Sequence, residues 1–190
     1  MEDIEIYELA SRVIGDITRD LNENTYAKLG GDLMVTWHEE RKFGDFASWL
    51  SEAGEPPKHR ATMHYELVRQ VWRDIENLCE FLRSIPKDSD VDKLYDFYGD
   101  STKLPKCFDD DTIVKNMFAA AITWVYFHEI GHLMQEHGFI RAEFTECCSD
   151  AAHSTDVHDF EASHDKRLIG REALVSHVTE LAADFEATHF

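Results

Sequence analysis

Apolar residues recur at steps of three and four positions along four stretches of the chain, a period that is typical of amphipathic α-helices. The predicted helices cover residues 3–21, 58–84, 112–137 and 171–190. Within the third stretch, only Gly131 disfavours a helix. One of the aspartates at 109–111 can cap the start of this helix. This stretch is predicted to be the central helix of the fold, ending at Gly138, where a glycine cap is expected.

Shorter patterns occupy the rest of the chain. The run "LMVTW" at residues 33–37 is β-branched and aromatic, which makes it the best candidate strand. "FASWLSEAG", residues 46–54, predicts a short helix closed by a glycine, and residues 141–168 are polar and weakly periodic, as in a loop or a poorly packed helix. The expected fold is mainly α (α+β), with a central helix packed against other helices and at most a small β-sheet.

Length and composition predict a single domain. A chain of 190 residues that is 43% hydrophobic can bury one substantial core, so residues 1–190 are expected to form one unit. The last predicted helix runs to the final residue without a stop signal, which leaves open that the chain is a fragment of a longer protein.

The charge balance excludes several classes of partner. With 38 acidic and 19 basic residues the net charge is −19, which repels nucleic-acid phosphates and anionic lipid surfaces. The longest apolar stretch, residues 117–127, is too short to span a bilayer, and the N-terminus lacks the pattern of a secretory signal. The four cysteines form no CxxC pair, as expected for reduced thiols. We therefore expect a soluble, cytoplasmic protein with no nucleic-acid and no membrane partner.

The sequence "HEIGH", residues 128–132, places reactive side chains on the central helix. Residues four apart share a helical face, so His128 and His132 can direct two imidazoles to one metal ion. Glu129 follows the first histidine, where its carboxylate can reach a water molecule on the metal, as the chemistry of an HExxH motif requires. Composition alone predicts about 0.06 accidental matches, and unpaired His and Glu on an apolar helix would be costly. We interpret the motif as a zinc site.

A catalytic zinc usually takes three protein ligands, so a third must come from another segment. His137 lies five positions beyond His132, about 140° further round a helix, and is predicted to be a surface or supporting residue rather than a ligand. Glu180, in "ELAAD", is the better candidate, because a second helix crossing the first can offer one carboxylate. Asp184 lies one turn further along the same face and can accept the second ring N–H of a ligand histidine.

HExxH followed by ExxAD, here Glu180 to Asp184, resembles the gluzincin peptidases. The resemblance implies a zincin-like domain in which His128, His132 and Glu180 hold Zn²⁺ while Asp184 orients a histidine.

Two related families differ from this chain at specific positions. Gln135 and Gly138 stand where the metzincin pattern requires glycine and histidine, so that family is excluded. His137 is similar to the extra histidine of the Lit-type phage-exclusion peptidases, whose HExxHxxxGH pattern has glycine where this chain has Glu136.

The resemblance implies a metalloprotease that hydrolyses a protein or peptide substrate, with Glu129 as the general base. The alternative is a non-catalytic zincin-like binding or regulatory protein that uses zinc for structure or sensing. An inhibitor or regulatory partner is compatible with both. Glu129 favours catalysis, because a structural zinc has no use for a carboxylate beside the water position.

The remaining candidates are weaker. His177, one turn before Glu180, is the candidate transition-state stabiliser, with Tyr126 and His189 as further alternatives. A second metal cluster would need three histidines whose spacing of five and six residues in a polar segment is more typical of solvent-exposed positions. These are His153, His158 and His164.

Overall fold

The computed structural model describes residues 1–39, 46–51, 55–97, 103–137, 140 and 170–189. The helices are α1 (Asp3–Leu21), α2 (Ala27–Leu29), α3 (Tyr65–Ser84), α4 (Asp90–Phe97), α5 (Asp110–Met134) and α8 (Gly170–Ala187), with a π-helix, η1 (Asn22–Tyr26), between α1 and α2. The strands are β1 (Asp32–His38), β2 (Phe46–Trp49) and β3 (Lys58–His64). Most of the described residues are helical, and the strands form one small sheet, which confirms the predicted mainly α class. Within these ranges, no helix has the length and apolar character that a membrane crossing requires.

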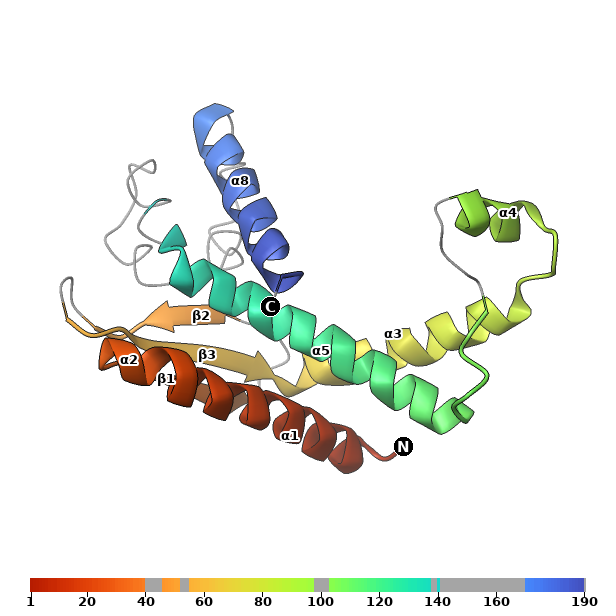
Figure 1. Ribbon diagram of the computed structural model, residues 1–190, viewed down its shortest axis with the longest axis horizontal. Helices are drawn as coiled ribbons and strands as arrows, with labels where there is room; N and C mark the ends of the chain where they lie inside the picture. The colour runs from red at the N-terminus through yellow and green to blue at the C-terminus, as the bar shows by residue number, and fades with distance from the viewer. Residues whose placement is uncertain (40–45, 52–54, 98–102, 138–139, 141–169, 190) are drawn as a thin grey trace.

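Helix α5 is the centre of the arrangement (Figure 1). It packs against α1, α3 and α8 and also contacts strands β2 and β3. The sheet and α1 lie along one side of α5, and α8 crosses its other side (Figure 1). Helix α4 lies at the end of the molecule that is distant from the sheet (Figure 1). The prediction of a central helix is confirmed. Helix α5 packs against the core on one side and against α8 on the other.

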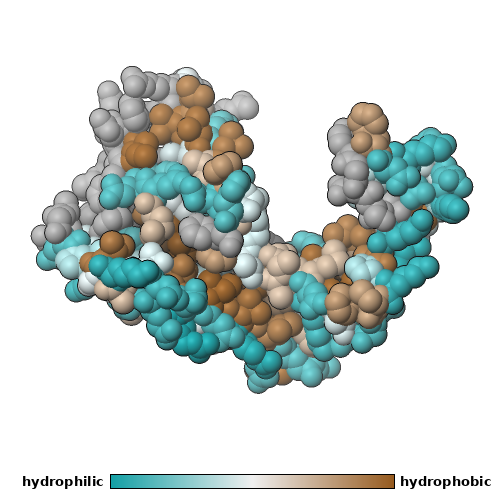
Figure 2. Space-filling model, in the orientation of Figure 1, coloured by the Kyte–Doolittle hydropathy of each residue, from teal (hydrophilic) through white to brown (hydrophobic). Residues whose placement is uncertain are grey.

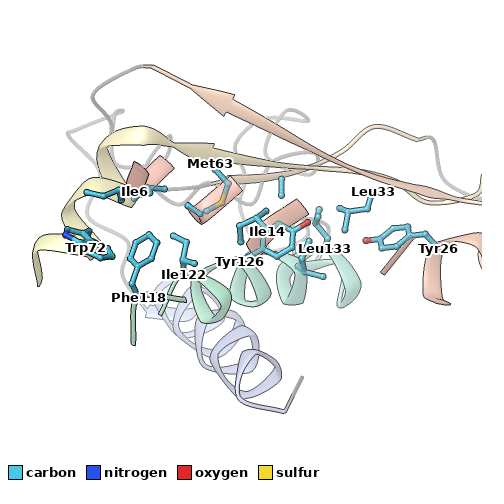
Figure 3. Packing of buried hydrophobic residues seen from close by; sticks show 14 residues of the cluster. Ile6, Ile14, Tyr26, Leu33, Met63, Trp72, Phe118, Ile122, Tyr126 and Leu133 are labelled. Carbon is cyan, nitrogen blue, oxygen red and sulfur yellow. The ribbon is translucent and has the colours of Figure 1, made fainter. Parts of the chain in front are cut away.

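The core lies between α5 and the layer of α1 and the sheet (Figure 3). The buried face of α5 turns large side chains toward this layer at steps of three or four residues, namely Phe118, Ile122, Tyr126, Ile130 and Leu133. They meet buried residues of α1 and of the sheet, among them Ile14, Leu33 and Met63 (Figure 3). Burying each large apolar side chain contributes roughly 1.5–3 kcal/mol before entropy is counted, so this cluster holds α5 firmly.

Side chains cap the first turns of α1 and α5. The Glu2 N–H donates to Glu5 Oε2 at 2.9 Å, which satisfies a donor at the start of α1. Asp109 Oδ1 accepts from the Thr112 N–H at 2.8 Å, and this hydrogen bond holds the pKa of Asp109 below its ordinary value. The predicted aspartate cap is confirmed at Asp109.

Strands replace helix at two predicted positions. Residues 46–49 form β2 rather than the start of a short helix, and residues 58–64 form β3 rather than the first turns of the long helix. β3 is the middle strand, parallel to β1 and antiparallel to β2. It is buried at all but two of its positions, so it lacks the alternation of polar and apolar residues by which a strand is recognised.

The other end of the central helix also differs from expectation. Helix α5 stops at Met134 with Gln135 as its C-cap, three positions before the predicted glycine cap. Gly138 lies outside the described residues, as do residues 141–168.

A buried histidine links three of these elements. His59 of β3 is 2% exposed, and its Nδ1 lies 2.6 Å from the hydroxyl of Tyr26 in η1. That hydroxyl is also 3.7 Å from Met134 Sδ at the end of α5. Burial lowers the pKa of His59 to about 4 and raises the pKa of Tyr26, so both side chains are neutral at pH 7.

We predict that His59 makes the fold sensitive to acid. Its ordinary pKa is 6.5, so the unfolded chain binds more protons than the folded one between about pH 6.5 and pH 4. The stability that is present above this interval is lost as pH falls through it, and the full shift corresponds to roughly 3 kcal/mol.

Denaturant unfolding of the metal-free protein at several pH values measures this loss. His59→Asn keeps a polar atom near Tyr26 but removes the titrating imidazole, so it should lose less stability than wild type over the interval. Equal losses in both proteins would show that His59 does not cause the acid sensitivity.

Candidate metal centre

The three predicted ligands meet where α8 crosses α5. One ligand atom from each of His128, His132 and Glu180 lies within 4.8 Å of the other two. The two histidine Nε2 atoms are 3.1 Å apart, and Glu180 Oε2 lies 3.2 Å from His128 Nε2 and 3.4 Å from His132 Nε2. This cluster of two nitrogens and one oxygen joins segments that are 48 or more positions apart in the chain.

The spacing of the three donor atoms fits a small metal ion with tetrahedral coordination. Ligands bound at about 2.0–2.1 Å in a tetrahedron are separated from one another by about 3.3–3.4 Å. The three observed separations run from 3.1 to 3.4 Å. An ion of that size therefore fits between the donors with little movement of the side chains.

Gly131 allows α8 to come this close. A Cβ atom added at Gly131 would lie 3.3 Å from the Cα of Ala183 and 3.4 Å from both the Ala183 carbonyl oxygen and Glu186 Cβ. Ala183 is itself fully buried. Glycine inside a helix costs about 1 kcal/mol relative to alanine, and here that cost is offset by backbone contact between the helices. The contact lies beside His132 on α5 and three positions from Glu180 on α8.

Asp184 orients one of the two histidines. Its Oδ1 lies 2.8 Å from His128 Nδ1, so it can accept the N–H of that nitrogen and leave Nε2 directed at the cluster. Burial opposes protonation of His128, but the hydrogen bonds and negative charges of Glu180 and Asp184 outweigh burial and raise its pKa. Because this proton must leave before a metal binds, metal affinity at the site falls as pH decreases.

The cluster is buried at one end and accessible at the other. The side chain of His132 is 2% exposed and that of His128 is 17% exposed. Glu180 and Asp184 are 32% and 44% exposed. The cluster is therefore accessible to solvent from the side of Glu180 and Asp184.

Other predicted residues take different places. Glu129 follows His128 on α5 and is half-buried, whereas His177 is exposed on α8. Tyr126 is not a stabiliser of the site: it is fully buried in the core, its hydroxyl lies 2.8 Å from Thr18 Oγ1, and burial raises its pKa to about 12. The ring of His189 stacks on Phe185. The histidines at 153, 158 and 164 lie outside the described residues.

Two further residues lie against the candidate ligand histidines. His137 is 2% exposed, so the surface alternative is wrong, and its Nδ1 lies 2.8 Å from His132 Nδ1, which makes it a supporting residue. Trp124 is 40% exposed with its ring centroid 5.5 Å from that of His128. Its position one turn before His128 was the signal for this contact.

Comparison of the chain with known protein families, with curated proteins and with solved structures finds no match. The three converging donors and the residues that orient them therefore indicate a group that could hold a metal ion. The motif spacing and the helix crossing point independently to the same three side chains.

The helix contact at Gly131 predicts contrasting effects of two glycine substitutions. Gly15 lies on α1, where an added Cβ meets no atom within 4 Å, so Gly15→Ala should raise the free energy of unfolding by up to about 1 kcal/mol. Gly131→Ala must displace the backbone of α8, so it should instead lower that free energy by about 1 kcal/mol. Denaturant titration measures both values, and equal stabilisation by the two substitutions would contradict the close approach.

Proposed function

We propose that this protein is a zinc-dependent metalloprotease with a zincin-like site. The observation that carries the proposal is the near-tetrahedral spacing of His128 Nε2, His132 Nε2 and Glu180 Oε2. Two imidazoles and one carboxylate are a donor set that suits catalytic zinc, which keeps a fourth position for water. The exposure of Glu180 supports an accessible fourth position.

The chemistry proposed is hydrolysis of a peptide bond. Zinc, when bound, supplies a Lewis acid that polarises a carbonyl group and acidifies a water molecule. Glu129 takes a proton from the attacking water and passes it to the leaving amine. His177, exposed one turn before Glu180, donates a hydrogen bond to the oxygen on which negative charge develops.

The surroundings of the site favour an extended peptide substrate over a small molecule bound in an enclosed pocket. The cluster opens where Glu180 and Asp184 are partly exposed, and Trp124 offers an aromatic surface beside His128. A peptide side chain packed on Trp124 would lie next to the bond to be cleaved. We propose a protein or peptide substrate in the cytoplasm, and an inhibitory or regulatory partner would act by covering this accessible edge.

Replacement of the proposed base tests catalysis separately from metal binding. Glu129→Gln should keep its zinc, because Glu129 is not one of the three donors, yet cleave an unfolded protein or a mixed peptide library at least about 100-fold more slowly than wild type. Glu76→Gln, an exposed change on α3, is the matched control and should cleave at the wild-type rate.

Two results oppose the proposal. Equal cleavage by wild type and Glu129→Gln would remove Glu129 from the mechanism. Full zinc occupancy with no cleavage of any peptide by wild type would favour the non-catalytic alternative, in which zinc serves structure or sensing.

A further inference from the structure

A chain of hydrogen bonds leads from His132 away from the cluster. His132 Nδ1 lies 2.8 Å from His137 Nδ1, and His137 Nε2 lies 2.8 Å from Gln135 Oε1. Gln135 Nε2 donates in turn to Glu186 Oε1 at 2.7 Å. The chain thus starts at a buried metal-ligand candidate on α5 and ends at a carboxylate on α8.

The donors and acceptors in this chain can be assigned from its carboxylate end. An ionised Glu186 only accepts, so the amide NH₂ of Gln135 faces it and the amide oxygen faces His137. An amide oxygen also only accepts, so His137 Nε2 must carry hydrogen. In a neutral imidazole the other nitrogen is then an acceptor, and His132 Nδ1 must donate to it. His132 Nε2 is left with its lone pair facing Glu180 and His128.

A turn after α5 makes this contact possible. The helix ends at Met134, and Glu136 adopts a left-handed conformation with φ 54°. This conformation is uncommon outside glycine and costs on the order of 1 kcal/mol. In a continuous helix, at about 100° per residue, His137 would lie about 140° round the axis from His132. The turn at Glu136 instead brings the ring of His137 against the ring of His132.

The two ligand histidines are therefore oriented by different means. Asp184 accepts from His128 Nδ1 at the accessible end of the cluster, where its charge remains partly hydrated. At the buried end, a carboxylate placed against Nδ1 of His132 would lose its hydration, which is costly. A neutral imidazole performs the same task there, and the carboxylate of Glu186 stands two side chains further away.

We infer that His137, held by Gln135 and Glu186, is a positioning residue that fixes the tautomer of His132 and thereby sets the metal affinity of the site. This inference rests on the metal site of the proposed function but not on peptide hydrolysis. The tautomer itself can be observed without metal.

Zinc affinity tests the consequence. In competition with a chromophoric chelator, His137→Phe should bind zinc about 10–100-fold more weakly than wild type. His137→Asn places an amide oxygen near the position of Nδ1, so it should recover most of the affinity. His38→Phe removes an exposed histidine of β1 and should bind as wild type does. Wild-type affinity in a folded His137→Phe protein would overturn the inference.

The nitrogen chemical shifts of the histidine rings test the cause. In metal-free wild type at mildly alkaline pH, where imidazoles are neutral, His132 should carry its hydrogen on Nδ1. A hydrogen on Nε2 would overturn the inference whatever the zinc affinity, and this measurement needs no variant that must fold. An Nδ1–H tautomer in a protein that binds no zinc would support the positioning of His132 by His137 but overturn both the effect on zinc affinity and the proposed zinc enzyme.

Discussion

Helix α8 can touch the backbone of α5 because Gly131 has no side chain, and the candidate site depends on that contact. Side chains reach only a few ångströms from a helix, so a carboxylate on one helix meets imidazoles on another only where the two helices lie close. The contact between Gly131 and Ala183 brings Glu180 within 3.4 Å of both ligand histidines. The opposite face of α5 is anchored in the main core, so α5 is a fixed platform against which α8 is docked (Figure 3).

The docking of α8 has a second consequence at the molecular surface. Large apolar residues on α8 remain exposed in the described structure, including Leu174, Val178, Leu181 and Phe185. Figure 2 shows apolar surface in this part of the molecule. The buried residues of α8 are instead small, among them Ala183 and Ala187, and the acids that reach the cluster are partly exposed. Helix α8 thus joins the fold mainly through close backbone approach and polar contacts rather than through a large apolar face.

Charge is distributed unequally across the cluster. Two partly exposed carboxylates, Glu180 and Asp184, stand at the accessible end, where they would compensate the charge of a divalent cation. At the buried end the ring of His132 lies against that of His137, and the carboxylate of Glu186 stands beyond His137 and Gln135. This arrangement keeps the carboxylates of the cluster at its solvent-accessible end rather than in the interior.

Sequence periodicity was sufficient for the helices that present one apolar face, such as α1. The motif spacing selected Glu180 and Asp184, and the structure places both carboxylates beside His128. Periodicity failed at β3, because a central strand buried on both faces has no alternating pattern. It also left open whether His137 lies on the surface or supports a ligand, because the helical-wheel argument assumed a helix that in fact ends before the left-handed turn at Glu136. That turn has no glycine to announce it, so no local signal marks it.

X-ray absorption at the zinc edge, on purified protein with its metal content determined, tests the central claim most directly. The account predicts one zinc per chain with only nitrogen and oxygen neighbours at about 2.0–2.1 Å and the scattering signature of two imidazoles. Sulfur neighbours at about 2.3 Å would mean that cysteines hold the metal, and a protein that takes up no zinc would contradict the account altogether.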